Sequence, residues 1–215
     1  MKVLVVDDHP LVREGVRYAL AALDRDVEVH EAGGAEEAFR ISEQHADLDL
    51  ILLDLGLPGL PGLAVLEQLR ERGCTSTIVV LSASIERGEV LSALNAGAMG
   101  FIPKLSSSDL MLQALRLVLA GGIYIPPQAV GILEGPGGFA AAGVAGPKSL
   151  HQLGLSERQH QVLALLAQGK PNKVIASDLK IAEPTVKAHI TEILRALQVT
   201  NRSQAMLVAR RFGVR

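Results

Sequence analysis

The first 125 residues alternate short apolar runs with longer segments whose apolar residues recur at helical spacing. Runs of four or five residues that are followed by a helical pattern are typical of buried strands in βα units. The pattern predicts strands at Lys2–Val6, Val27–His30, Leu50–Leu53, Thr77–Leu81 and Gly100–Pro103. It predicts helices at Pro10–Leu23, Ala35–Gln44, Gly62–Arg72, Ile85–Asn95 and Ser108–Ala120. Five consecutive βα units indicate a flavodoxin-like, doubly wound parallel α/β sheet with strand order 2-1-3-4-5.

The last 65 residues show helical periodicity only. The sequence Ser-Glu-Arg-Gln at 156–159 predicts a capping box that opens a first helix. Further helices are expected at Lys173–Leu179, at Glu183–Leu197 and from Asn201 to Arg211. On the third helix an apolar stripe faces a small core, and the opposite side carries Lys187, Ala188, Thr191 and Arg195. Two helices joined by a tight turn, the second with a polar exposed face, predict a small all-α helix-turn-helix domain. A plain helical bundle with a solvated face is the alternative.

Composition separates these two parts of the chain. Between residues 126 and 150, 15 of 25 residues are Gly, Ala or Pro, which predicts a flexible or partly extended linker. The expected organisation is therefore a domain at 1–125, a linker at 126–150 and a second domain at 151–215. The first domain has 10 Lys and Arg against 18 Asp and Glu, whereas the second has 10 against 4. The basic domain is therefore the candidate for nucleic-acid binding.

Cysteine content and hydropathy limit the kinds of cross-link, metal site and membrane segment that the chain can contain. Cys74 is the only cysteine, which excludes an intrachain disulfide and a cysteine-based metal site. No apolar stretch approaches the length of a membrane span, and the opening Val3–Val6 is too short for a signal peptide. We therefore expect a cytoplasmic protein with no membrane partner.

Polar residues end four of the predicted strands. Asp7 and Asp8 follow the first, Asp54 the third, Ser82 the fourth and Lys104 the fifth. Since the carboxyl ends of parallel strands meet at one edge, these groups should converge there. A single acid at such a position is commonly only a helix cap, but four matching strand ends favour a site.

Three converging carboxylates should not all stay ionised without a cation, and a set of oxygen ligands suits Mg²⁺, completed by waters and a phosphate. The site is therefore interpreted as one where a phosphoryl group is placed on an aspartate. The run Gly56–Gly62 could suggest a nucleotide loop instead. However, its G-x-x-G-x-x-G spacing is not that of a P-loop, no Lys-Ser/Thr follows, and two prolines remove backbone donors.

These residues resemble the receiver domain of a two-component response regulator. The resemblance rests on Asp7-Asp8, Asp54 with Pro58 four residues later, Ser82-Ala83, and Lys104 behind Gly97–Phe101. It implies that Asp54 accepts phosphate from a sensor histidine kinase or a small phosphodonor. It also implies that Asp8 and Asp54 ligate Mg²⁺ directly, Asp7 through water, and Gly56 through its main-chain carbonyl. Lys104 and Ser82 would bind the other phosphoryl oxygens.

In such receivers a hydroxyl and an aromatic residue switch between two packings. Here the pair would be Ser82, which moves toward the new phosphoryl oxygens, and Phe101, which swings into the space that is vacated. A plain core aromatic on the last strand is the alternative interpretation of Phe101.

The C-terminal segment closely resembles the LuxR-type, or NarL/FixJ, DNA-binding domain. The similarity runs through Leu155–Gln159, Asn172–Ala176, Thr185–Ile190 and Gln198–Ala205. It implies double-stranded DNA as a partner, a dimer surface on the last helix, base contacts by one set of residues and phosphate contacts by another. The base-facing set is Lys187, Ala188 and Thr191, and the phosphate set is Lys173, Thr185, Arg195 and Arg202. Two departures are Ala182 where a Ser or Thr cap is usual, and the weak base-reading groups of Ala188 and Thr191.

The sequence thus predicts a response-regulator transcription factor rather than an enzyme, whose phosphorylation at Asp54 promotes homodimerisation or frees the DNA-binding domain. Two alternatives remain. The receiver could be controlled without phosphorylation, although its pocket is complete. The protein could also be a phosphatase with an aspartate nucleophile, although the haloacid-dehalogenase type has an Asp-x-Asp pair and the acids here are adjacent.

Overall fold

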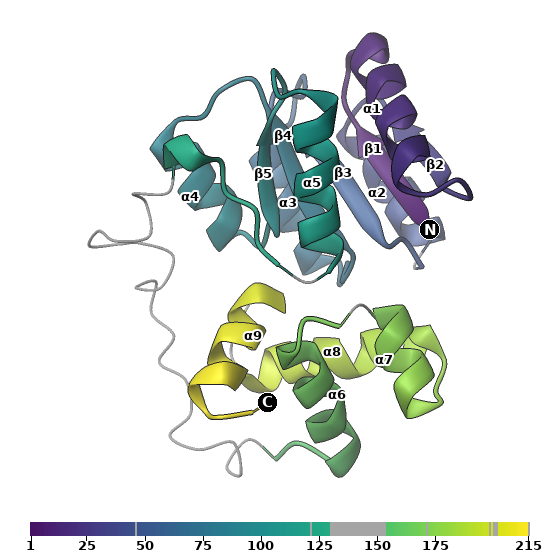
Figure 1. Ribbon diagram of the computed structural model, residues 1–215, viewed down its shortest axis with the longest axis vertical. Helices are drawn as coiled ribbons and strands as arrows, with labels where there is room; N and C mark the ends of the chain where they lie inside the picture. The colour runs from purple at the N-terminus through teal and green to yellow at the C-terminus, as the bar shows by residue number, and fades with distance from the viewer. Residues whose placement is uncertain are drawn as a thin grey trace.

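The computed structural model describes residues 1–45, 47–120, 122–129, 154–170, 172–197, 199 and 202–214. It consists of a larger α/β unit and a smaller all-helical unit (Figure 1). Within the described ranges, no helix combines the length and the apolar character needed to cross a membrane. The predicted linker falls largely on residues 130–150, which lie outside the described ranges, so its character stays a prediction.

Five parallel strands form the sheet of the first unit, in the predicted order β2-β1-β3-β4-β5. The strands are β1 Lys2–Val6, β2 Glu28–Ala32, β3 Leu50–Asp54, β4 Thr77–Ser82 and β5 Gly100–Pro103. The central strand β3 is buried along its whole length, because helices cover both faces of the sheet. The predicted fold class is therefore confirmed.

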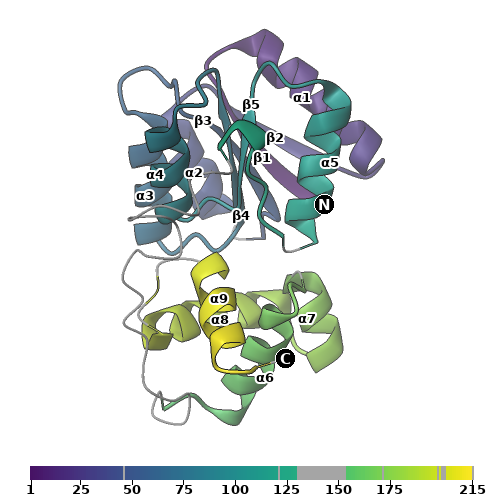
Figure 2. The same cartoon turned by 60° about the vertical axis from the view of Figure 1, so that its left-hand side comes forward.

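The side chains of alternate residues in each strand pack into two separate cores, one on each face of the sheet. Helices α1 (Pro10–Leu23) and α5 (Ser108–Leu119) pack on one face, as Figure 2 shows. Helices α2 (Ala35–Gln44), α3 (Gly62–Glu71) and α4 (Arg87–Asn95) cover the other face. Val3 and Val5 of β1 belong to the first core, whereas Leu4 and Val6 belong to the second. This strict alternation fixes which way each strand-end side chain points.

The element boundaries differ from the prediction by a few residues. Strand β2 begins one residue late, because the Val27 N–H bonds the Asp24 carbonyl in the preceding turn, and it continues to Ala32, which pairs with Val6. Strands β3 and β4 run one residue further, so that Asp54 and Ser82 are the last residues of their strands. Helix α4 starts at Arg87 rather than Ile85, after a loop in which Ser84 Oγ accepts the Glu86 N–H.

A short segment after α5 lies along the outer edge of β5. The Phe101 N–H donates to the Tyr124 carbonyl at 3.0 Å, and the Tyr124 N–H donates to the Met99 carbonyl at 3.1 Å. Tyr124 thereby forms an isolated parallel bridge with Gly100. The chain stays on this domain as far as Ala129, which is 3% exposed and belongs to the same core as Phe101.

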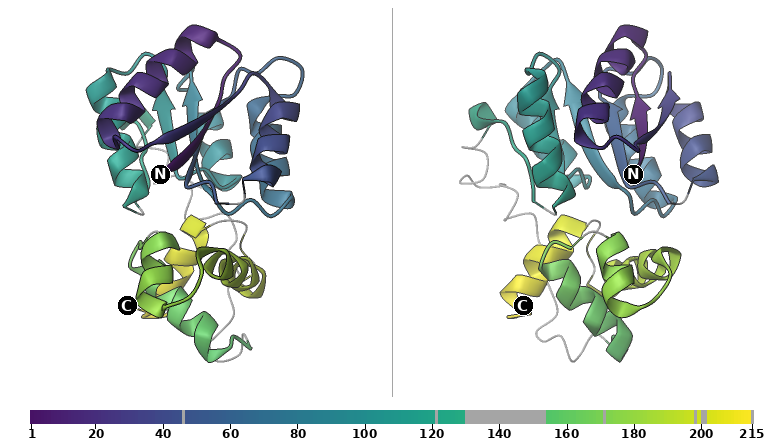
Figure 3. Two further views of the ribbon diagram at one scale, coloured as in Figure 1. Left: turned by 90° about the vertical axis from the view of Figure 1, so that its right-hand side faces the viewer. Right: turned by 45° about the vertical axis from the view of Figure 1, so that its right-hand side comes forward.

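The second unit contains helices α6 (Glu157–Ala167), α7 (Asn172–Leu179), α8 (Glu183–Leu197) and α9 (Arg202–Arg211), which surround one core (Figure 3). The predicted capping box at the start of α6 is present: Ser156 Oγ accepts the Gln159 N–H, and Gln159 Oε1 accepts the Ser156 N–H. The predicted core stripe of α8 is also confirmed, since Val186, Ile190 and Ile193 are all at most 2% exposed.

The turn between α7 and α8 depends on one left-handed residue. Lys180 has a φ of 55°, the only positive φ at a non-glycine residue among those described. This conformation lets the Ile181 N–H reach the Ala176 carbonyl at 3.0 Å and ends α7 after Leu179. A side chain with a Cβ is strained there, and glycine is not.

We therefore expect Lys180→Gly to stabilise the helical domain by about 0.5–1 kcal/mol, because it relieves this strain. Chemical denaturation followed by circular dichroism measures the change. Lys173→Gly, at an exposed position in the first turn of α7, is the matched control and should destabilise the domain rather than stabilise it. A loss of stability in Lys180→Gly equal to that of the control would contradict the assignment.

Candidate functional site

The strand-end groups converge as predicted. Lys104, just after β5, places its Nζ atom 2.7 Å from Asp7 Oδ2 and 2.7 Å from Asp54 Oδ2. Both carboxylates are almost completely buried, with exposures of 0% for Asp7 and 2% for Asp54. Asp7 follows β1 and Asp54 ends β3, and these strands are neighbours in the sheet. The parallel register therefore brings residues 47 positions apart to one ammonium group.

Backbone donors hold each carboxylate in place. The Gly56 N–H donates to Asp54 Oδ1 at 2.9 Å, and the His9 N–H donates to Asp7 Oδ1 at 2.9 Å. Arg13 of α1 donates from Nη1 to the Asp7 carbonyl at 2.7 Å and from Nε to Glu31 Oε2 at 2.9 Å. One oxygen of each carboxylate is thus fixed by the main chain, and the other is left for a charged partner.

Two glycines control the space around Asp54. A Cβ at Gly56 would be in van der Waals contact with both Asp54 carboxylate oxygens, at 3.5 Å, so glycine leaves this side of the carboxylate uncovered. A Cβ at Gly62 would lie 2.1 Å from the Asp54 main-chain oxygen and 2.5 Å from the Leu55 Cα. Only glycine therefore allows α3 to begin directly against the end of β3. The sequence analysis assigned a role to Gly56 and missed Gly62.

The pocket carries excess negative charge. Ligand atoms of Asp7, Asp8, His9 and Asp54 lie within 4.8 Å of one another, and Lys104 supplies the one ammonium close to them among the described residues. Burial alone would lower the pKa of Lys104, but hydrogen bonds and charges from Asp54 and Asp7 raise it above its usual 10.5. Because the pKa of Lys104 is higher in the folded state than in the unfolded state, its ion pairs contribute stability that is fully present below the unfolded pKa. This stability is lost as the pH rises through the folded pKa. At neutral pH, well below both values, the ammonium is charged.

Three carboxylate oxygens still lack a hydrogen bond of good geometry. They are Asp7 Oδ2, Asp8 Oδ1 and Asp54 Oδ2, all buried at the atomic level. Lys104 Nζ lies 2.7 Å from two of them and His9 Nδ1 lies 2.7 Å from the third, so each oxygen is in close contact with a nitrogen atom. Orphaned carboxylate oxygens that share one small space are the donor set that a hard divalent cation binds. The residues present fit such an ion.

The remaining receiver residues lie beside this cluster. Ser82 is 5% exposed, its Oγ accepts the Ser84 N–H at 3.1 Å, and its carbonyl accepts the Lys104 N–H at 2.8 Å. Phe101 is fully buried in the core beneath α3 and α4. Of the two arrangements expected for the Ser82 and Phe101 switch, the structure contains one, in which Phe101 is buried.

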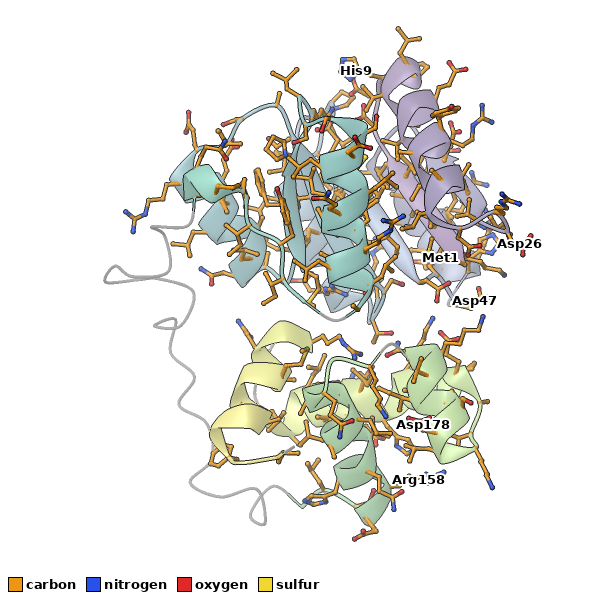
Figure 4. The ribbon with its side chains drawn as sticks, in the orientation of Figure 1. Met1, His9, Asp26, Asp47, Arg158 and Asp178 are labelled. Carbon is orange, nitrogen blue, oxygen red and sulfur yellow. The ribbon has the colours of Figure 1, made fainter. Side chains whose placement is uncertain are left out.

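His9 is the second residue that the sequence analysis missed. Its Nδ1 lies 2.7 Å from Asp8 Oδ1 and 3.2 Å from Asp7 Oδ1, and its side chain is 64% exposed. Figure 4 labels it at the end of the α/β unit that lies away from the helical unit. The signal was available, since His9 directly follows the two acids in the sequence.

The predicted DNA-reading face of α8 is on the side opposite to the domain core. Thr185, Ala188 and Arg195 are exposed. The Lys187 side chain is largely buried, with its Nζ 3.7 Å from Glu183 Oε1, and Thr191 Oγ1 donates to the Lys187 carbonyl at 3.1 Å. Lys173 of α7 is exposed as well. The face therefore presents cationic, hydroxyl and small side chains together.

Arg202 lies in a different environment from the other predicted phosphate-binding residues. Its Nη1 donates to Asn172 Oδ1 at 2.9 Å, and its Nη2 donates to the Lys170 carbonyl. Burial lowers the pKa of its guanidinium to about 10. Arg202 thus joins the start of α9 to the turn between α6 and α7.

Comparison with protein families gives two matches. Residues 3–116 match the response regulator receiver domain, and residues 153–209 match the bacterial regulatory proteins of the luxR family. The chain is 41% identical over 210 residues to the glycerol metabolism activator of Pseudomonas putida, covering 97% of this chain and 94% of that protein. It is 35% identical to the nitrate/nitrite response regulator protein NarL of Escherichia coli K12, covering 94% and 92%.

Solved structures give the same result. A LuxR-family two-component response regulator from Aurantimonas covers 60% of this chain and 91% of its own, with 31% identity and a TM-score of 0.54. The RcsB response regulator of Salmonella typhimurium covers 98% of both chains, and at 23% identity and a TM-score of 0.55 it shows the fold alone. The chain belongs to the response regulators that join a receiver domain to a LuxR-type DNA-binding domain.

Proposed function

We propose that Asp54 is the phosphoacceptor of this transcription regulator, and that its phosphorylation by a sensor histidine kinase or a small phosphodonor controls DNA binding. The observation that carries the proposal is the Asp54 carboxylate itself. It is buried at a strand end, held by the Gly56 N–H through one oxygen and paired with Lys104 through the other. Glycine at 56 leaves one side of the carboxylate uncovered. The proposed location is the cytoplasm.

The transfer requires little covalent chemistry from the protein. An Asp54 oxygen forms a bond to phosphorus, and the bond from phosphorus to the donor nitrogen or oxygen breaks, with the electron pair leaving on the donor. Lys104 moves from pairing two carboxylates to binding a phosphoryl oxygen, and the Ser82 hydroxyl donates a hydrogen bond to another phosphoryl oxygen. The new phosphoryl group adds charge and acceptors that Ser82 and Lys104 satisfy only in a rearranged pocket.

Mg²⁺ is the cation proposed for this pocket. Asp8, Asp54 and the Gly56 carbonyl would hold it directly, and Asp7 would do so through water. When bound, the ion neutralises charge on the transferring phosphoryl oxygens. The orphaned oxygens of Asp7, Asp8 and Asp54 support this assignment. Its fit is chemical, since all these donors are oxygen atoms.

The arrangement of the two domains suggests how the receiver restrains the DNA-binding domain. A cavity is lined by Glu43, Cys74 and Thr75 of the receiver and by Lys187, Ala188 and Thr191 of α8. Glu43 and the recognition helix thus border the same space, and Lys187 is 12% exposed. A DNA duplex needs this face free, so we propose that phosphorylation separates the domains or favours a dimer in which they are apart.

On DNA, Lys187, Ala188 and Thr191 would face base edges in the major groove, and Lys173, Thr185 and Arg195 would bind phosphates. Arg202 belongs to the proposed phosphate set, although its present hydrogen bonds imply that it also keeps α7 and α9 together. A two-fold homodimer would bind half-sites about one helical turn apart.

The central test is intact mass and DNA affinity after incubation with Mg²⁺ and a small acyl phosphate. Wild type should gain one phosphoryl group and bind DNA more tightly, whereas Asp54→Asn should do neither. Asp26→Asn, a carboxylate outside the pocket, is the matched control and should behave as wild type. Equal DNA binding by wild type and Asp54→Asn with and without the phosphodonor would favour a receiver that acts independently of phosphorylation.

Metal binding should raise the thermal stability of the protein. Removing one charge from the crowded pocket by Asp8→Asn should raise the melting temperature in the absence of metal, because it relieves repulsion. Mg²⁺ at ten times its dissociation constant should stabilise wild type by about 1.4 kcal/mol and Asp8→Asn much less. Thermal unfolding with and without Mg²⁺ measures both effects. An equal Mg²⁺ response in the two proteins would exclude Asp8 as a ligand.

The DNA contacts differ in their expected salt dependence. Arg195→Ala should weaken binding to selected and unrelated DNA about equally and reduce the slope of log affinity against log salt by about 1, because one phosphate contact is lost. Lys187→Ala should instead reduce the preference for the selected sequence. Fluorescence anisotropy over a salt series separates the two. An unchanged slope in Arg195→Ala would remove that residue from the phosphate set.

A further inference from the structure

Arg13 connects three elements of the receiver beside the acid pocket. It belongs to α1, its Nη1 donates to the Asp7 carbonyl at the end of β1 at 2.7 Å, and its Nε donates to Glu31 Oε2 of β2 at 2.9 Å. Its side chain is only 19% exposed. Neither contact involves a carboxylate oxygen of the pocket, and the proposed phosphoryl transfer gives Arg13 no part.

Asp8 is the acid of the pocket that the sheet does not hold. Asp54 is the last residue of β3, and the Asp7 N–H donates to the Ala32 carbonyl at 3.1 Å, next to the last paired residues of β1 and β2. Asp8 lies in a bend between β1 and α1. Its side chain is 30% exposed, whereas that of Asp7 is fully buried. The position of Asp8 must therefore be fixed by contacts other than strand pairing.

The Asp7 carbonyl is the group through which Arg13 can act on Asp8. Because the peptide unit is planar, the direction of this carbonyl sets the positions of the Asp8 nitrogen and Cα. The Asp7 N–H is held by β2 and the Asp7 carbonyl by Arg13, so the backbone is held on both sides of the Asp7 Cα. A hydrogen bond from a charged donor is stronger than one between neutral groups. The backbone of Asp8 thus starts from a position that Arg13 holds.

Glu31 balances the charge that Arg13 brings to this region. An unpaired guanidinium near the pocket would repel a divalent cation and weaken its binding. The ion pair between Arg13 Nε and Glu31 Oε2, at 2.9 Å, offsets that repulsion. Arg13 can therefore support the pocket through its hydrogen bond to the Asp7 carbonyl.

We propose that Arg13 is a positioning residue for phosphoryl transfer: by holding the Asp7 carbonyl, it places the Asp8 carboxylate where it binds the divalent cation. The inference rests on the metal site of the proposed function. Charge and positioning predict effects of opposite sign. Removing a nearby positive charge should tighten Mg²⁺ binding. Losing the group that orients a ligand should instead weaken it, typically by about 10- to 100-fold.

Arg13→Met separates these effects, because methionine keeps an apolar stem and removes the charge and both hydrogen bonds. In calorimetric titration of the full chain with Mg²⁺, its dissociation constant should be about 10-fold or more above that of wild type. Arg17→Met is the matched control, since Arg17 is an exposed residue one turn further along α1 and carries the same charge. It should not weaken Mg²⁺ binding. Arg13→Lys keeps a charged donor and should bind Mg²⁺ more tightly than Arg13→Met.

Hydrogen exchange of the metal-free protein gives a readout that does not depend on the ion. Peptides containing Asp8 and His9 should exchange faster in Arg13→Met than in wild type, and peptides from β3 and β4 should not change. Unchanged or tighter Mg²⁺ binding by Arg13→Met would overturn the proposal. Weaker binding with an equal loss of protection across the whole receiver would also overturn it, because the role would then be structural only. In both cases the Mg²⁺ site would stand, whereas absence of Mg²⁺ binding by wild type would overturn that site and this inference with it.

Discussion

The sharing of one ammonium between two buried carboxylates is the interaction on which the receiver depends. Lys104 can reach both Asp7 and Asp54 only because β1 and β3 are adjacent and in parallel register, with β5 two strands beyond β3. A buried carboxylate without such a partner would be neutralised or would destabilise the fold. In the proposed phosphoryl transfer, the group that holds the resting pocket together is therefore the group that would have to release a carboxylate when a phosphoryl group arrives. Stability and the proposed signal reception would then depend on one set of contacts.

The fold and the pocket could be predicted from sequence because both follow from local pattern. Apolar runs identified the strands, and a polar residue at the end of a run identified its place at the edge of the sheet, as with Asp54 and Ser82. What could not be predicted depends on contacts between distant backbone segments. The need for glycine at 62 arises from the approach of α3 to the end of β3, and the burial of Arg202 arises from packing of α9 on the turn before α7. Neither has a periodic signature.

The helical domain shows the same division between pattern and packing. The capping box of α6 and the apolar stripe of α8 are local features and appear where the sequence placed them. The left-handed turn at Lys180 is not signalled, since lysine has no preference for that conformation and glycine would be expected. A basic side chain thus precedes α8, the helix proposed to read DNA, at some conformational cost.

The segment that follows α5 also bears on how this protein avoids pairing with other chains. An uncovered outer strand exposes N–H and C=O groups that can recruit a foreign strand and start aggregation. Tyr124 pairs with the Phe101 N–H and the Met99 carbonyl, so that part of this edge is covered by the protein's own chain. The opposite end, β2, is short and carries Glu28 and Glu31, whose charges oppose strand addition. Both edges of the sheet thus carry features that oppose the addition of a foreign strand, although the sheet is not closed into a barrel.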